Sequence, residues 1–158
     1  MDENALDVLE TAMQLEKDGL RFYHQVSENI EDKQVADVFQ KLGRDEADHL
    51  EFLEMQYESL AKSESWMVFQ ELYREDETAD DRPAHLLDNE KIHHLIHEGM
   101  TSAQAVKVGI KLEKDSVRFY ELQSKSCGDP SGQQMYLKLM DFEKGHVKDL
   151  ETLLKKLK

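Results

Sequence analysis

Residues 16–23 read Glu-Lys-Asp-Gly-Leu-Arg-Phe-Tyr, and residues 113–120 read Glu-Lys-Asp-Ser-Val-Arg-Phe-Tyr, so six of eight positions return 97 residues later. Polar, apolar and helix-capping positions elsewhere keep the same offset: Glu46 with Glu143, His49 with His146, Leu42 with Leu139, Leu53 with Leu150, and Asp32 with Asp129. One coincidence of this kind is common, but a single offset shared by so many kinds of position is not. The chain is therefore built from two related halves.

Each half has the pattern of a helical hairpin. Apolar residues recur at the three- and four-residue spacing of amphipathic helices, and no segment alternates with period two for long enough to be a strand. The hairpins cover about residues 4–61 and 101–158. Residues suited to N-cap positions precede the four helices: Asn4, Asp32, Thr101 (or Ser102) and Asp129, the last followed by Pro130. We therefore predict an all-α chain, a single domain over residues 1–158, folded as a four-helix bundle.

The two hairpins are joined by a connection of about residues 62–100, which is long for a compact domain. If a two-fold axis relates the hairpins, the second helix ends at one end of the bundle and the third begins at the other. A helix of about 25 residues is about 37 Å long at 1.5 Å per residue, and the connection spans that distance. We expect short helices within it. Such a length also permits two chains to exchange hairpins in a homodimer.

Several other side chains are of types that often carry function, but the sequence does not strongly support a functional role for any of them. An apolar stripe of the connection is expected to pack on the bundle or on a second chain: Trp66, Phe69, Leu72 and Tyr73. His93 and His97 have the spacing of metal ligands on a helix, yet with His85 and His94 nearby we interpret them as solvated. Cys127 falls in the turn before the fourth helix, where nothing near it in sequence lowers a thiol pKa.

The composition excludes several classes of protein. Twenty Lys and Arg residues stand against 34 Asp and Glu, a formal net charge of −14, which argues against a nucleic-acid partner and an anionic lipid surface. No apolar run approaches the ~20 residues of a membrane-spanning helix, and the acidic first residues do not resemble a signal peptide. A single cysteine excludes disulfide frameworks and thiolate metal centres, so we expect a cytoplasmic protein.

Six polar residues fall on helix faces that should meet inside the bundle. They comprise one Glu from each of two helices and one Glu-x-x-His from each of the other two: Glu16, Glu113, Glu46 with His49, and Glu143 with His146. A spacing of three places the Glu and the His on one face, and a buried carboxylate is costly unless it is paired or bound to a metal. This set is typical of a di-iron or di-manganese centre in a four-helix bundle. Four carboxylates balance two divalent ions, and the histidines favour Fe(II) or Mn(II) over calcium or magnesium.

With these motifs the sequence resembles the ferritin-like di-iron superfamily and, within it, the rubrerythrins. The resemblance covers both hairpins, about residues 4–60 and 101–158. It implies a left-handed bundle with two metals at mid-height. It also implies the ligand roles: Glu46 and Glu143 bridge the metals, Glu16 with His49 completes one site, and Glu113 with His146 completes the other.

Tyr23 and Tyr120 lie seven residues after Glu16 and Glu113, two turns along the same helix faces. By the resemblance they are tyrosines that hydrogen-bond to the ligands and quench radicals, and we name them as candidate catalytic residues. Their pattern is equally that of core tyrosines.

Two positions depart from the rubrerythrin pattern. Ser116 stands where the third helix usually carries a second Glu, and His146 stands where Glu is common. Both changes make the site more symmetric, as in bacterioferritins, and put in doubt the iron movement associated with rubrerythrins.

The resemblance implies a di-iron oxidoreductase that reduces hydrogen peroxide, or dioxygen, to water under oxidative stress. Because one cysteine cannot hold the iron of a rubredoxin module, electrons are expected from a separate, rubredoxin-like protein. Three alternatives stay open. The centre could hold manganese, or mixed iron and manganese, and dismutate peroxide. The protein could store, deliver or sense iron without turnover. It could also be a helical interaction module with a vestigial site.

Overall fold

The computed structural model describes residues 3–67 and 100–157. Four α-helices account for nearly all of them: α1 (Glu3–Asn29), α2 (Lys33–Ser63), α5 (Ser102–Ser126) and α6 (Pro130–Lys156). Strands are absent from these two ranges, and the predicted all-α class is confirmed. No helix in the described part of the chain is long and apolar enough to cross a membrane.

Local side-chain chemistry sets where the helices begin. The N-caps predicted at Asp32, Thr101 and Asp129 are confirmed, because each side-chain oxygen accepts a hydrogen bond from a backbone N–H of the first turn. Thr101 does so within a reciprocal capping box. These bonds satisfy donors that the helix itself leaves without partners. The prediction of a cap at Asn4 is wrong, because α1 already includes Glu3.

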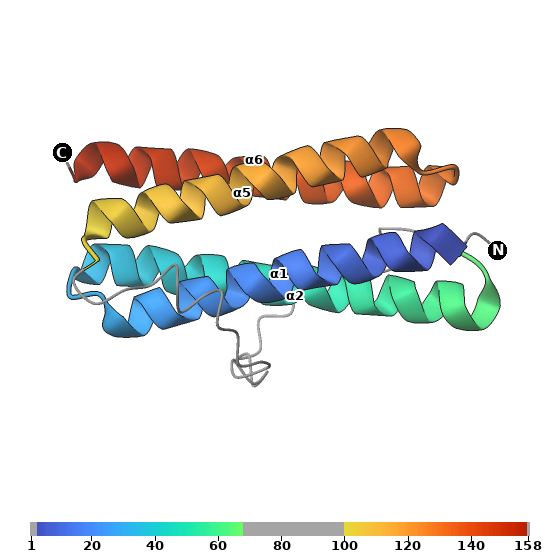
Figure 1. The fold of residues 1–158 in the computed structure, drawn as a ribbon, viewed down its shortest axis with the longest axis horizontal. Coiled ribbons are helices and arrows are strands. Elements are labelled where there is room, and N and C mark those ends of the chain that lie inside the picture. The colour runs from blue at the N-terminus through green and yellow to red at the C-terminus, as the bar shows by residue number, and fades with distance from the viewer. Residues whose placement is uncertain (1–2, 68–99, 158) are drawn as a thin grey trace.

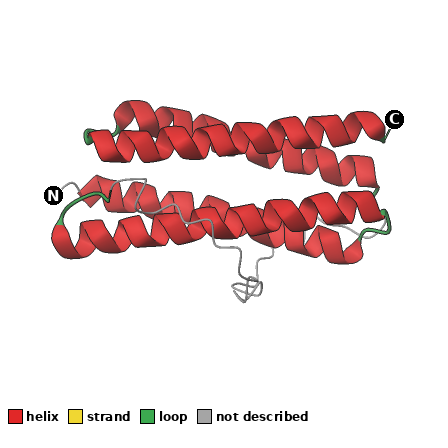
Figure 2. Cartoon of the chain, turned by 180° about the vertical axis from the view of Figure 1, so that it is seen from behind, coloured by secondary structure: helices red, strands yellow, loops and turns green. Residues whose placement is uncertain are grey.

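The helices form two antiparallel hairpins stacked in two layers, α1 with α2 and α5 with α6 (Figure 1). The view from behind shows the same two layers (Figure 2). Across the layers α1 packs on α5 and α2 on α6. Helix α2 ends beside the α5–α6 turn, an end we call the Cys127 pole. Helix α5 begins at the opposite end, beside the α1–α2 turn, which we call the Met100 pole. The connection between the hairpins must therefore join opposite ends of the bundle, as the two-fold relation predicts.

Two apolar clusters fill the bundle, one toward each pole. The cluster on the Met100 side includes Phe22, Tyr23, Val26, Val35, Phe39, Leu42, Leu150 and Leu153. The cluster on the Cys127 side consists of Leu9, Ala12, Leu53, Leu60, Tyr120, Met135, Tyr136 and Leu139. Full burial of one such side chain stabilises the fold by about 1.5–3 kcal/mol. The clusters thus fix the helices on both sides of a polar layer between them.

Candidate metal centre

Six buried polar side chains occupy this layer, and all four helices contribute to it. None is more than 5% exposed: Glu16 on α1, Glu46 and His49 on α2, Glu113 on α5, and Glu143 and His146 on α6. They form two groups that share Glu46 and Glu143. One group adds Glu16 and His49, and the other adds Glu113 and His146. In each group, one donor atom from every residue lies within 4.8 Å of the others. The structure thus brings all six predicted residues together, in the predicted pairs.

Contacts between the hairpins hold the layer together. Nδ1 of His49 lies 2.9 Å from Oε1 of Glu143, and Nδ1 of His146 lies 3.1 Å from Oε1 of Glu46. Each histidine also faces the glutamate three residues before it on its own helix, at 3.7 Å in α2 and 3.3 Å in α6. Because Nδ1 is the inward atom of both rings, it is the nitrogen that each histidine would offer to an ion.

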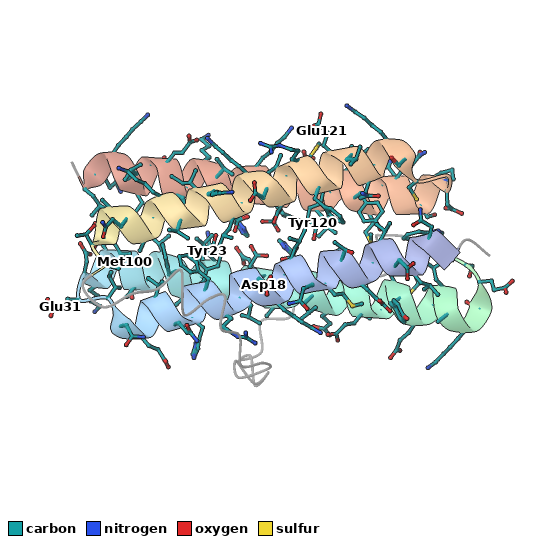
Figure 3. All side chains as sticks on the ribbon, in the orientation of Figure 1. Asp18, Tyr23, Glu31, Met100, Tyr120 and Glu121 are labelled. Carbon is teal, nitrogen blue, oxygen red and sulfur yellow. The ribbon has the colours of Figure 1, made fainter. Side chains whose placement is uncertain are left out.

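Two tyrosines hold the remaining carboxylates from across the layers. The hydroxyl of Tyr23 donates to Oε1 of Glu113 at 2.5 Å, and that of Tyr120 donates to Oε1 of Glu16 at 2.6 Å. Both tyrosines are fully buried and lie between the two hairpins (Figure 3). Each tyrosine of one hairpin therefore orients a candidate ligand of the other hairpin. Their catalytic role stays a prediction.

The outer sides of the two histidines differ. Nε2 of His146 lies 3.0 Å from Oδ2 of Asp45. The ring of His49 instead stacks on Phe142, with centroids 5.2 Å apart and an interplanar angle of 27°. Asp45 and Phe142 are equivalent positions of the repeat, each directly before the shared glutamate. A carboxylate behind a histidine fixes its tautomer and ring orientation. Of these two equivalent positions, only Asp45 supplies such a carboxylate, and it supports His146.

Asp45 is a candidate functional residue that the sequence pattern does not predict. Its position directly before Glu46 was visible, but the repeat did not mark it because the equivalent residue is Phe142. Of the other candidates, Trp66 packs on the apolar cluster of the Cys127 side. The rest of the apolar stripe, the histidines at 85, 93, 94 and 97, and the short helices expected in the connection lie outside the described residues.

Protons compensate the negative charge of this layer. Burial by itself lowers the pKa of His49, but hydrogen bonds with Glu143 and Glu46 outweigh it and raise that pKa to about 10. The pKa of His146 is likewise raised, against the effect of burial, by the carboxylates around it. Burial and the charges of Glu46 and Glu143 raise the pKa of Glu113 well above its usual range. The pKa of Glu143 is lowered well below its usual range, because hydrogen bonds from its neighbours overcome burial.

The residues of the layer fit a pair of divalent cations. Oε2 of Glu16 and Oε2 of Glu113 are buried and have no hydrogen-bond partner within the described ranges. Their other oxygens are held by the tyrosines, so these two buried atoms remain available to a bound ion. Mixed carboxylate and imidazole donors suit Fe(II) or Mn(II). Such ions would displace the protons that now balance the carboxylates. The part of each residue as a metal ligand stays a prediction.

Comparison with known proteins identifies a matching family and solved structures with a similar fold. The family model described as rubrerythrin matches residues 7–154, and none of the curated proteins matches the sequence. A two-domain protein from Anabaena variabilis ATCC 29413, with DJ-1/ThiJ/PfpI-like and ferritin-like domains, is similar with a TM-score of 0.70 at 13% identity. The match covers 97% of this chain and 39% of that one, so this chain spans well under half of its length.

A hypothetical protein from Pyrococcus furiosus is similar with a TM-score of 0.67 at 16% identity, over 95% of this chain and 87% of that one. At such identities the likeness concerns the fold alone. It confirms the predicted ferritin-like four-helix bundle.

Proposed function

The chain belongs to the rubrerythrin family, and on this premise we propose that it is a di-iron oxidoreductase that reduces hydrogen peroxide to water. The observation that carries the proposal is the pair of buried ligand groups that share Glu46 and Glu143. Two carboxylates shared between the groups suit a pair of adjacent ions better than they suit a single ion. Iron bound there would supply Lewis acidity and the two electrons that cleavage of the oxygen–oxygen bond requires.

The chain's own residues position the centre and keep it dry. Helices α2 and α6 each present a Glu-x-x-His face, and helices α1 and α5 each add one glutamate, so all six candidate ligands sit on helices. Tyr23 and Tyr120 hold the carboxylates of Glu113 and Glu16 with their phenolic protons. Asp45 accepts from Nε2 of His146 and so leaves Nδ1 free for an ion. The apolar clusters on both sides exclude bulk water, which strengthens every charge interaction in the layer.

We propose that the electrons come from another molecule. The single cysteine of the chain, Cys127, cannot provide the thiolates of a rubredoxin-type iron site. We therefore include a separate rubredoxin-like donor in the proposal, together with a cytoplasmic location and a homodimer in which the long connection permits exchange of hairpins. Dioxygen is the second oxidant that the proposal allows.

Rapid mixing tests the proposal. The full chain is loaded with Fe(II) without oxygen, mixed with hydrogen peroxide or with dioxygen, and followed by the absorption of oxo-bridged ferric iron. We expect rapid oxidation by peroxide, and its loss in Glu46→Gln. Glu58→Gln is the matched control, because Glu58 lies on the same helix with its side chain 70% exposed. Oxidation no faster than that of free Fe(II) in buffer would overturn the peroxidase function.

Two further measurements separate the alternatives. Metal analysis of protein isolated from its native host distinguishes iron from manganese, and a manganese pair would replace peroxide reduction by dismutation. Iron loading followed by size-exclusion chromatography distinguishes storage, which requires many irons per chain and a large assembly. We expect two irons per chain and a dimer.

A further inference from the structure

Aromatic rings lead from the polar layer to the Cys127 pole. Tyr120, whose hydroxyl is bonded to Glu16, stacks on Tyr136 with centroids 6.1 Å apart and an interplanar angle of 26°. Tyr136 in turn meets Trp66 edge to face, again with centroids 6.1 Å apart. We call these three rings the aromatic column. All three are side chains that can lose one electron, so the column is oxidisable along its whole length.

The other half of the repeat has no such column within the described residues. Tyr23 corresponds to Tyr120, but its neighbour at the position of Tyr136 is Phe39, at a centroid distance of 5.2 Å. A phenylalanine ring is far harder to oxidise than a phenol. Ile30 stands where the Cys127 pole has its cysteine. The same fold therefore carries an oxidisable route toward one pole and an inert one toward the other.

The outer end of the column meets a thiol and a cavity. The indole of Trp66 and Sγ of Cys127 each come within 3.1 Å of the point where a Cβ at position 132 would stand, so Gly132 lets them approach the same spot. Tyr136, Trp66 and Cys127 also line a cavity of about 270 Å³, which has room for several water molecules at about 30 Å³ each. The hydroxyl of Tyr136 is buried and has no partner among the described residues. Other atoms of Tyr136 line the cavity, and the hydroxyl itself is closed to solvent, so its proton reaches cavity water only when the side chains around it move.

We propose that the aromatic column is a one-electron conduit that carries electrons from the Cys127 pole to an oxidised Tyr120. The inference rests on the proposed function for its source of oxidising equivalents, which is hydrogen peroxide acting at the loaded centre when too few electrons are present. Under these conditions the oxidisable side chains bonded to candidate ligands are Tyr23 and Tyr120, and of the two only Tyr120 belongs to the aromatic column. The conduit moves the damage away from the ligands, to a pole where soluble reductants have access.

The transfer balances in electrons and protons. Oxidised Tyr120 has lost one electron, and its proton has passed to the carboxylate of Glu16. An electron from Tyr136 restores Tyr120, which takes its proton back, while Tyr136 releases its own proton to water in the cavity. Trp66 then gives one electron to Tyr136, which regains a proton from the cavity, and the indole releases its N–H proton. A soluble thiol returns one electron and one proton to Trp66, and two oxidised thiols join as a disulfide.

Pulse radiolysis tests the conduit without iron chemistry. The full chain is loaded with Zn(II), which has no redox chemistry, and azide radicals oxidise Trp66, the only tryptophan of the chain. We expect the tryptophan radical to convert to a tyrosyl radical at a rate independent of protein concentration, which measures transfer along the same path in the reverse direction. This step should slow in Tyr136→Phe and keep its rate in Tyr57→Phe, a tyrosine bonded to Glu10 at the surface. Conversion of Tyr136→Phe at the wild-type rate overturns the proposal, as does an absence of conversion in the wild type.

Iron-loaded protein gives the second reading. After treatment with limited peroxide, peptide mapping should find oxidised Trp66 in the wild type and in Tyr57→Phe. In Tyr136→Phe the amount of oxidised Trp66 should fall to that found in iron-free protein. Ferric absorption recorded in the same samples reports the proposed function separately. Rapid iron oxidation with equal damage at Trp66 in all three proteins removes the conduit and leaves the peroxidase function in place. Absence of iron oxidation removes the function, and the radiolysis result still decides on the conduit.

Discussion

The two halves of the polar layer present the same candidate ligands but differ directly behind them. His146 has the carboxylate of Asp45 at 3.0 Å from its outer nitrogen, whereas His49 has the ring of Phe142 stacked against it. A carboxylate in this position orients the imidazole and makes it a stronger ligand, while a phenyl ring only packs against it. Identical donors therefore do not make identical sites, and we expect the His146 half to bind its ion more tightly.

Removal of a shared ligand should have the largest effect. Glu46→Gln takes a carboxylate from both groups, so we expect both ions to be lost. Glu16→Gln and Glu113→Gln each take a carboxylate from one group, so we expect the content to fall from two ions to one. Metal analysis after gel filtration measures the content. Retention of two ions in Glu46→Gln would contradict a shared role, and Glu58→Gln is the control with two ions.

The pH dependence of the metal-free protein should show whether His49 carries a titrating proton. The pKa of His49 is about 10 in the fold against 6.5 ordinarily, so the folded state binds this proton more tightly than the unfolded state. Its stabilisation is complete below pH 6.5 and is lost as the pH rises toward 10. We expect Tm to fall across this window, and the fall to become shallower in His49→Gln.

His24→Gln is the matched control for the pH series. His24 lies on α1 at the surface, 3.3 Å from Glu28, with its side chain 40% exposed. Its variant should show the same slope of Tm against pH as the wild type. An equal slope in His49→Gln and in the wild type would show that His49 does not hold the proton.

The contrast between Asp45 and Phe142 can be removed by substitution. Asp45→Asn should weaken metal binding in the His146 half by about 10–100-fold, the usual cost of removing a hydrogen-bond partner of a ligand. Phe142→Asp should strengthen binding in the His49 half and bring the two affinities together. Calorimetric titration with Mn(II) resolves the two binding steps. Asp37→Asn, an exposed change on the same helix as Asp45, is the control, and equal steps in the wild type would contradict the comparison.

Substitution of either tyrosine should have the smallest effect, a loss of stability that is similar in the two variants. Tyr120→Phe and Tyr23→Phe each remove one buried hydrogen bond to a carboxylate. We expect the free energy of unfolding of the metal-free protein to fall by about 1.5–3 kcal/mol in each, as for hydrogen bonds to charged groups. Urea unfolding measures it. A loss in only one of the two variants would show that the halves differ here as well.

Most of the fold and all six candidate ligands could be predicted from the sequence, because the repeat copies them. A shared offset of 97 residues relates the helix caps, the core positions and the Glu46–His49 pair of the first half to their counterparts in the second half. Helical spacing then fixes which side chains share a face. Those signals are local or periodic, and they depend on no packing detail.

The rest could not be predicted because it breaks the repeat. Asp45 acts on a histidine 101 residues away, and its counterpart is apolar, so neither spacing nor symmetry marked it. The contact of Tyr136 with Tyr120 and Trp66 depends on the rotation of α6 against its neighbours, which a periodic pattern does not give. The cap predicted at Asn4 is wrong for a smaller reason, since a sequence pattern places a helix boundary only to within one or two residues.

Each ligand group takes three residues from one hairpin and one from the other, so any bound ion would fasten the two layers together. A lone hairpin paired with a copy of itself would contain every one of these ligands, which makes a symmetric dimer of half-length chains a sufficient ancestor for the centre. In such a dimer every substitution appears twice. A single chain has no such constraint, so an acid can stand behind one imidazole and a phenol beside one tyrosine without the same residue on the opposite side.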